Sequence, residues 1–349
     1  MGYVIRLVKK IGEKLTVVSW IPSDKMGYVP LREVEVDNQQ KEVYLSSFRI
    51  KKMPMRITAA LRNCSLYRYF LKNVKKEDTV IVYHATSIIK PLLKAKRKIG
   101  FKLILEVEEI YHVDNKIKNA KATKLKEEAL ISVADSYVIV NDLIFDNYVN
   151  NQKPYMVLYG VYDGKGFNVI DKVGEKPIKL LFSGSLDRVR GSFLAIETAK
   201  LLTNDYELHV CGAGETSYVN QLKLEIEKNN AKKDGCKIIY HGQLSEQKLD
   251  KLALSCDIGL NLQDVNNPFE SVSFPSKITF YLQHGLTVIS TKMSSVLASK
   301  LASAVDFCEC NAVGVVEVIQ KVKLKEKKKN MRVMDELDVC AQEELKALL

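Results

Sequence analysis

The most informative part of the chain is residues 267–290, NPFESVSFPSKITFYLQHGLTVIS. It reads as a loop that carries the carboxylate of Glu270, a short apolar helix that begins at Pro275-Ser276-Lys277, a stop at Gly285 and a buried strand. The first turn of a helix presents unpaired backbone N–H groups, and here a hydroxyl and an ammonium group accompany them. The stretch therefore predicts a binding site for a phosphate or diphosphate group, with Glu270 able to accept hydrogen bonds from a sugar diol.

The second half of the chain predicts a doubly wound α/β domain. Short apolar runs that are typical of buried strands alternate with helical patterns such as those at 193–202 and 245–255. Alternation of this kind produces parallel βαβ units, in which ligands bind beyond the carboxyl ends of the strands. The predicted strands span residues 178–182, 206–210, 237–240, 258–262 and 287–290.

The first half predicts a second domain of the same kind. Its predicted strands span residues 15–20, 79–83, 102–107 and 136–140, with an additional strand at 43–48, and its predicted helices span 88–99 and 121–133. A doubly wound domain usually opens with a central strand and a glycine turn, whereas residues 4–11 here have the apolar spacing of a helix. Either the start is shortened, with Gly2 as the last trace of the turn, or the sheet is one strand smaller.

The length of 349 residues exceeds what one ordinary core holds and suits two α/β domains. We expect an N-terminal domain over residues 1–160, a linker at 163–166, a second domain over 161–330 and a C-terminal helix over 331–349 that packs back toward the first domain. No apolar run approaches the roughly 20 residues of a membrane span, and the first residues lack the features of a signal peptide. The seven cysteines include no Cys-x-x-Cys pair, so we expect reduced thiols in a cytoplasmic protein and no metal.

The positive charge of the chain is concentrated in its first half. Residues 1–160 contain 28 Lys and Arg against 17 Asp and Glu, whereas residues 161–349 contain 25 of each, so the whole formal net charge of +11 lies before residue 161. Lysine clusters lie at residues 72–76, 94–102 and 116–126. Such asymmetry indicates an anionic partner for this half, such as a lipid surface, a lipid-diphosphate or a nucleic acid. The alternative is a solvated face on lysine-rich helices.

Four segments of the second half, taken in order, resemble a known family. They are Phe182–Leu186 with Arg190-Gly191, the Gly-x-Gly turn in His209–Glu215, the short strand end Tyr240–Leu244, and Pro275-Ser276-Lys277 with Gly285. This order and spacing resemble the GT-B glycosyltransferases, specifically the retaining enzymes of family four and their Pro-Ser-Lys subgroup, which builds bacterial surface polysaccharides. The resemblance covers the second half well and the first half loosely.

The resemblance implies a fold and a reaction. The fold would be GT-B, with two doubly wound Rossmann-like domains facing a cleft and the first domain lacking its first strand. The reaction would be metal-independent, retaining transfer of a hexosyl group from a nucleotide-sugar, UDP-linked by our expectation, to a glycan or lipid-linked acceptor. It needs no cofactor beyond this substrate. We expect a peripheral position on the inner face of the cell membrane, and the oligomeric state is left open.

The resemblance also implies which residues bind the donor and what they do. Arg190 and Lys277 would neutralise the leaving diphosphate and so act in catalysis, and Glu270 would hold hydroxyls of the donor sugar or ribose. Two positions depart from the family pattern, because Ser185 stands where Arg is common and Phe280 stands where a second Glu is expected. Arg188 is a candidate replacement for the missing Arg. The implied donor-binding residues are Gly184, Ser185, Arg188, Arg190, Gly212, Gly214, Glu270, Pro275, Ser276 and Lys277.

Acceptor residues are expected at strand ends of the first domain. His84 follows the strand at 79–83, and Glu106, Glu108 and Glu109 stand at and after the end of the next strand, where the family often has His. We expect His84 and Glu108 to bind the acceptor, and either Glu108 or Glu109 to orient its hydroxyl in catalysis. The structural alternatives are a hydrogen-bonded His84 and a helix cap made by the two glutamates.

Other classes of protein fit the sequence less well. A GT-B-like protein that binds a glycan or a partner without turnover is the main alternative, because Phe280 and the missing first strand both favour it. A nicotinamide-dependent oxidoreductase would need a third glycine after Gly212 and Gly214, and Ser217 stands there instead. No aromatic–basic motif or zinc-ligand spacing supports nucleic-acid binding.

Overall fold

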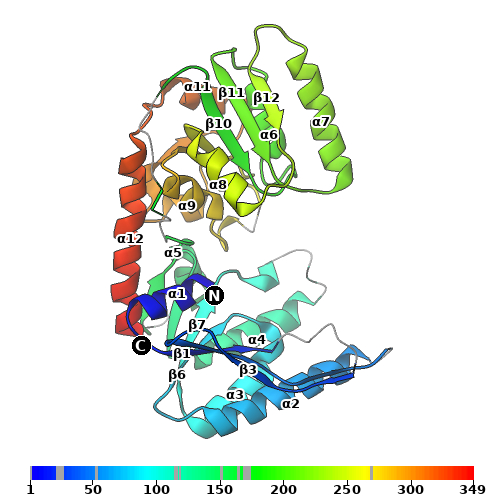
Figure 1. The fold of residues 1–349 in the computed structure, drawn as a ribbon, viewed down its shortest axis with the longest axis vertical. Coiled ribbons are helices and arrows are strands. Elements are labelled where there is room, and N and C mark those ends of the chain that lie inside the picture. The colour runs from blue at the N-terminus through cyan, green and yellow to red at the C-terminus, as the bar shows by residue number, and fades with distance from the viewer. Residues whose placement is uncertain are drawn as a thin grey trace. The chain divides into compact units, whose positions relative to one another are not determined.

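The computed structural model describes residues 2–20, 27–51, 54–113, 117, 119–149, 152–162, 166–167, 174–267 and 270–349. The chain divides into two compact units (Figure 1). Unit 1 contains Met1–Val140, Phe145–Leu158 and Cys340–Leu349, and unit 2 contains Asn141–Ile144 and Tyr159–Val339. Most of the expected linker, residues 163–165, lies outside the described residues, as do Lys116 and Lys118 of one lysine cluster.

Unit 2 is built on a six-stranded sheet in the order β12-β11-β10-β13-β14-β15, in which every neighbouring pair is parallel. The order reverses between β10 and β13, which makes the sheet doubly wound and confirms the prediction for this half. The strands are β10 (Ile178–Ser183), β11 (Tyr206–Cys211), β12 (Lys237–Tyr240), β13 (Ile258–Asn261), β14 (Thr287–Thr291) and β15 (Val305–Cys308). Only β15 was not predicted from the sequence.

The strands of unit 2 read as continuous apolar runs because helices cover both faces of a parallel sheet. Leu180 and Phe182 of β10 point to one face and pack with Leu208 and Val210 of β11 in a fully buried core. The helices are α5 (Asp142–Ile144), α6 (Ser192–Ala199), α7 (Thr216–Asn230), α8 (Glu246–Leu254), α9 (Ser276–Gln283), α10 (Ser294–Leu297), α11 (Ala312–Lys321) and the first part of α12 (Lys327–Leu348).

Unit 1 contains a four-stranded parallel sheet in the order β6-β7-β8-β9, formed by β6 (Thr79–Tyr83), β7 (Lys102–Val107), β8 (Ser136–Ile139) and β9 (Tyr155–Val157). A separate sheet has the order β1-β4-β3, in which β1 (Leu15–Ser19) is parallel to β4 (Gln40–Tyr44) and β3 (Arg32–Glu35) is antiparallel to it. A two-stranded ribbon joins β2 (Gly27–Val29) to β5 (Ser47–Arg49). The additional strand expected at 43–48 is therefore two strands with different partners.

The first position of a doubly wound sheet is not filled by a described strand of unit 1. In such a sheet the first strand lies between the second and the fourth. Here β1 and β4 match the second and third positions, and β6 matches the fourth. Both β1 and β6 are edge strands of their sheets, so no described strand pairs with the two of them in the first position. The chain opens instead with the predicted helix α1 (Gly2–Lys10), which buries Val4 and Leu7.

The remaining helices of unit 1 are α2 (Met55–Asn73), α3 (Ile89–Ile99) and α4 (Ala120–Val133). The sequence predicted α3 and α4 but not α2, which buries Leu66 and Phe70 and stacks Phe70 on Phe101 with ring centres 5.6 Å apart. The last residues of α12 belong to unit 1, where Leu345 is buried and the carbonyl of Leu349 accepts a hydrogen bond from Thr79 Oγ1 at 3.3 Å.

Candidate functional site

Two glycine-bearing loops pack against each other at the carboxyl ends of β10 and β11. Gly184 has φ +129° and its N–H donates to the carbonyl of Cys211 at 3.1 Å. A Cβ at Gly212 would lie 1.8 Å from the carbonyl oxygen of Gly184, and a Cβ at Gly214 would lie 2.4 Å from that of Leu186. These glycines are therefore required for the loops to approach, whether or not a ligand also lies close to their backbone.

Lys277, the second residue of α9, lies against the loop that follows β10. Its Nζ donates to the carbonyl of Arg190 at 3.1 Å and lies 4.1 Å from the ring centre of Phe182. A Cβ at Gly184 would meet Lys277 Cε at 3.3 Å. Burial of the ammonium group, together with the positive charge of Arg190, lowers the pKa of Lys277 to about 7.

A buried chain of polar side chains holds Arg190 from the other side. Arg190 Nη1 donates to Gln263 Oε1 at 3.2 Å, Gln263 Nε2 donates to Asn261 Oδ1 at 3.3 Å, and Asn261 Nδ2 donates to Ser290 Oγ at 2.9 Å. Asn261 and Ser290 are fully buried, and Gln263 is nearly so. No pattern in the sequence marks Gln263 or Asn261, which link Arg190 to the ends of β13 and β14.

Tyr281 fixes α9 to the strand ends. Its hydroxyl accepts a hydrogen bond from the N–H of Ser183 at 2.9 Å, and it donates to the carbonyl of Leu260 at 3.3 Å. The ring occupies the space above Gly259, where a Cβ would lie 2.3 Å from it. This contact places the start of α9, with Pro275 buried and Ser276 exposed, next to the loop after β10.

Glu270 has a partner of its own within unit 2. Its carboxylate accepts from the N–H of Ser294 at 2.8 Å and from the hydroxyl of the same residue. It therefore caps the start of α10, and a sugar hydroxyl would have to share these oxygens. Phe280, at the position expected for a second Glu, packs its ring on His284 with centres 4.3 Å apart.

Ser185 and Arg188 are the other two candidate donor residues in the loop after β10, and each has different surroundings. Ser185 is exposed, and the guanidinium of Arg188 stacks on Phe193 at 4.5 Å from the ring centre. The structure thus brings Gly184, Arg190 and Lys277 together, beside the turn that holds Gly212 and Gly214. Arg188 and Glu270 have other partners.

His84, one of the expected acceptor residues of unit 1, lies beside a buried carboxylate that no sequence pattern marks, Glu127 of α4. Its two oxygens accept from the N–H groups of Tyr111 at 2.8 Å and His112 at 3.0 Å, and one of them lies 2.6 Å from His112 Nδ1. His84 is 1% exposed, with Nδ1 3.1 Å from the carbonyl oxygen of Glu109 and Nε2 3.6 Å from Glu127. Burial lowers the pKa of His84.

Glu108 and Glu109 are half-buried on the segment that Glu127 holds. Burial, followed by hydrogen bonds to Tyr111 and Glu108, raises the pKa of Tyr83. Glu106 is 4% exposed, and burial raises its pKa. Glu108 therefore acts on Tyr83, and burial, followed by the charges of Glu109 and Glu108, raises the pKa of Tyr111. A direct contact of His84 with an acceptor would require the surrounding residues to move.

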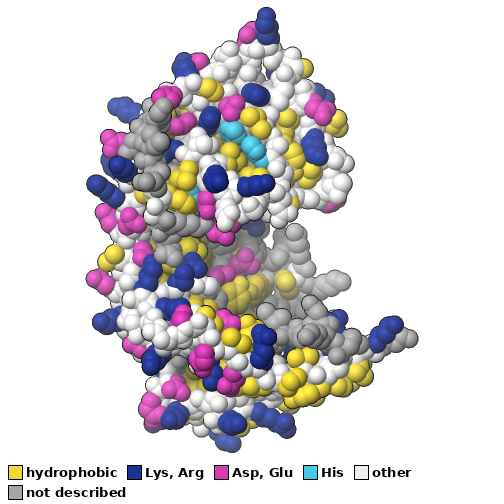
Figure 2. Space-filling view, viewed as in Figure 1, with side chains coloured by type: hydrophobic (Ala, Val, Ile, Leu, Met, Phe, Trp, Pro, Cys, Tyr) yellow, Lys and Arg dark blue, Asp and Glu magenta, His cyan; other side chains and the backbone are white. Residues whose placement is uncertain are grey.

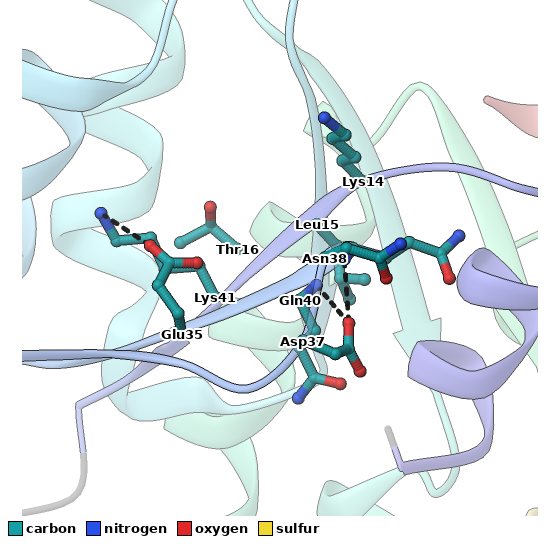
Figure 3. A pocket seen from close by; sticks show the side chains of 9 residues that line it. Lys14, Leu15, Thr16, Glu35, Asp37, Asn38, Gln40 and Lys41 are labelled. Atoms are coloured by element: carbon teal, nitrogen blue, oxygen red, sulfur yellow. Dashed lines mark hydrogen bonds and ion pairs between the residues drawn. The ribbon is translucent and has the colours of Figure 1, made fainter.

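A pocket of about 300 Å³ lies elsewhere in unit 1, between the start of β1 and the β3–β4 turn (Figure 3). It is lined by polar and charged side chains that include Lys14, Asp37 and Gln40. Asp37 accepts hydrogen bonds from the N–H groups of Gln39 and Gln40, both at 2.9 Å. Asp37 therefore has a structural role, because these bonds hold the β3–β4 turn. The pocket lies at the amino end of β1, away from the edge where α/β sheets bind ligands.

No group of three or more metal-ligating side chains occurs within the part of the chain that the structure describes. Among the same residues, no helix is long and apolar enough to cross a membrane.

A family model matches part of the second half of the chain. Residues 168–332 match the family model of glycosyl transferases group 1. No curated protein matches the sequence.

Several solved structures share the fold at low sequence identity. One described as trehalose-6-phosphate from E. coli bound with UDP-2-fluoro glucose has a TM-score of 0.65 at 13% identity, covering 97% of this chain and 91% of that one. The lipopolysaccharide outer core galactosyltransferase WaaB has a TM-score of 0.62 at 16% identity, covering 89% and 84%. HepE of Anabaena in complex with UDP has a TM-score of 0.58 at 11% identity, covering 83% and 82%. The chain has the GT-B fold, as the sequence predicted.

Proposed function

We propose that the chain is a glycosyltransferase that moves a hexosyl group from a nucleotide-sugar to a hydroxyl of a glycan or lipid-linked acceptor. The observation that carries the proposal is the juxtaposition of Arg190 and Lys277 beside Gly184. The positive charge of Arg190 disfavours the charged form of Lys277, and a bound anion would offset that repulsion. A diphosphate is the anion that fits two cations and a set of backbone N–H groups.

The same groups would assist the chemistry without a metal. When the bond between the anomeric carbon and the diphosphate breaks, its electron pair remains on the diphosphate. Arg190 and Lys277 would stabilise that charge, and the acceptor oxygen would form the new bond to the anomeric carbon while its hydroxyl proton passes to the departing diphosphate. The resemblance to family four implies retention of configuration. Two structures of the same fold support a UDP-linked donor, since one is bound with UDP-2-fluoro glucose and the other is in complex with UDP.

The remaining assignments belong to the same proposal. The loop glycines, Ser185, Pro275 and Ser276 would contact the nucleotide, and Glu270 would share its oxygens between Ser294 and a sugar hydroxyl. Unit 1 would bind the acceptor, with Glu108 or Glu109 orienting its hydroxyl and His84 supporting that segment. The acceptor would be part of cell-surface polysaccharide synthesis, at the inner face of the cell membrane.

Thermal shift with UDP, GDP, ADP, CMP and NAD tests the donor site. We expect stabilisation by one nucleoside diphosphate, UDP, that disappears in Lys277→Ala and persists in Lys248→Ala, a change of an exposed lysine of the same unit. Stabilisation that survives Lys277→Ala would refute the site. A well-folded protein that responds to none of the nucleotides would refute the transferase.

A GT-B-like binding protein without turnover is the second candidate, and Phe280 favours it. The resemblance expects a glutamate at position 280, whose carboxylate would bind the ribose. This chain has a phenyl ring there instead, and it packs on His284. The two candidates differ in the release of UDP from UDP-sugars in the presence of saccharide acceptors. Binding of UDP without any transfer or hydrolysis would support the second candidate.

A further inference from the structure

The outward face of α2 combines apolar and basic side chains. Ile57, Leu61, Arg68, Leu71 and Lys72 follow the spacing of one helix face about 120° wide, opposite the buried Leu66 and Phe70. The exposed fractions are 50% for Ile57, 43% for Leu61 and 39% for Leu71. This helix therefore has two faces with large apolar side chains, of which only the inner one is buried within the unit.

The apolar surface continues from α2 onto β5, with which α2 packs. Phe48 and Ile50, on and just after β5, are 36% and 49% exposed, and Tyr28, the partner of Phe48 across the ribbon, is 67% exposed. Figure 2 shows hydrophobic side chains gathered along the lower right of the view, where Figure 1 places α2, with Lys and Arg side chains near them. An exposed apolar surface of this kind marks an interaction site.

The charge of the same segment identifies the kind of partner. Residues 43–76, which contain β5 and all of α2, include nine Lys and Arg and no Asp or Glu. A basic face alone would suit nucleic acid, but isoleucine and leucine side chains gain nothing from contact with a phosphate backbone. A helix face with both apolar and basic side chains suits the boundary between lipid headgroups and acyl chains.

We propose that the outward face of α2, together with β5, docks on an anionic lipid bilayer. Ile57, Leu61 and Leu71 would enter the headgroup region, while Arg68 and Lys72 would lie against lipid phosphates. The inference deepens the proposed function, because a lipid-linked acceptor would lie at such a surface. Vesicle binding is measured without any transfer reaction, so the membrane-docking proposal and the proposed transferase function can fail separately.

Sedimentation with vesicles tests this surface. We expect the full chain to bind vesicles that contain phosphatidylglycerol, to bind pure phosphatidylcholine at least about tenfold more weakly, and to be released by high salt. The double variant I57E/L61E should lose at least about tenfold in partitioning to the anionic vesicles. The matched control L201E/L224E changes two leucines of unit 2 that are 53% and 56% exposed and should bind as the wild type does.

Cys64 offers a second readout, because it is exposed and its position in the helix places it on the same face of α2. An environment-sensitive fluorophore on Cys64, with Cys310 and Cys340 changed to Ser, should shift to the blue on anionic vesicles, whereas the same label on Cys340 alone should not. Equal binding to both kinds of vesicle, unchanged binding of a folded I57E/L61E protein, or binding to RNA in preference to vesicles would each overturn the proposal.

Discussion

Lys277 has a charge that depends on pH in the range where the protein would be assayed. Its pKa of about 7 in the free protein should rise when an anion binds, so that binding takes up a proton above pH 7. The affinity for UDP should therefore fall as the pH rises from 7, by at most about tenfold per pH unit. Isothermal titration calorimetry at pH 7 to 9, in buffers with different ionisation enthalpies, measures both the affinity and the proton uptake.

The control for this pH dependence is Lys277→Arg, because an arginine stays charged throughout the range. Its affinity for UDP should not change between pH 7 and 9, even if it is lower than that of the wild type. The last proton of the UDP phosphates leaves at a pKa of about 6, and its loss adds negative charge that favours binding to a cation. An affinity that still falls with rising pH in the arginine variant would therefore assign the proton to another group of the protein.

Gln263 should act on the reaction through Arg190. In Gln263→Leu the guanidinium loses an acceptor at 3.2 Å, and a hydrogen bond to a charged group contributes about 1.5–3 kcal/mol. We expect kcat/KM for the nucleotide-sugar to fall by about tenfold or more, with UDP affinity reduced in parallel and the KM for the acceptor unchanged. Steady-state kinetics give these values, with Gln247→Leu on the exposed face of α8 as the matched control.

Several residues of the candidate site were predictable because a local pattern marks them. Gly184, Gly212, Gly214, Arg190 and Lys277 each belong to a short segment with a turn or a helix start. The polar partners were not predictable in this way. Gln263 lies 73 residues from Arg190, Ser294 lies 24 residues from Glu270, and Glu127 lies 15 residues from His112, so only the tertiary fold brings each pair together.

At the scale of elements, the hydroxyl of Tyr281 links α9 to the end of β10. In Tyr281→Phe the N–H of Ser183 loses its partner in a buried position, which costs about 1–3 kcal/mol. We expect a decrease of this size in the free energy of unfolding and weaker UDP binding, because the start of α9 is less well fixed. Urea unfolding with and without UDP tests this, and Tyr218→Phe, at a half-buried tyrosine of the same unit, should have a smaller effect.

The elements that the sequence predicted are those with a strong apolar period or run. Of the five predicted strands of unit 2, β13 and β14 are fully buried and β10 is mostly so, and these three read as largely apolar segments. In contrast, α2 was not predicted because both its faces contain apolar residues, so its pattern lacks the contrast that marks a surface helix. The short strand β15 has a half-buried Asp306 in its middle, which interrupts the apolar run.

At the scale of the whole molecule, the two units should respond differently to a nucleotide. If UDP binds only at the carboxyl edge of the unit 2 sheet, hydrogen exchange should slow at 183–191, 212–215 and 276–281. Peptides from residues 79–113 of unit 1 should exchange at an unchanged rate in UDP alone. Hydrogen-exchange mass spectrometry checks both regions in one experiment, and protection confined to unit 1 would contradict the assignment of the donor site.

The pairing of Arg190 with Lys277 also has a consequence for the end of each catalytic cycle. Once the sugar has been transferred, the nucleoside diphosphate is the ligand with the most charge to offer these two groups, and its departure restores their mutual repulsion. Turnover would then be governed by product release, and the spent nucleotide would compete with fresh donor.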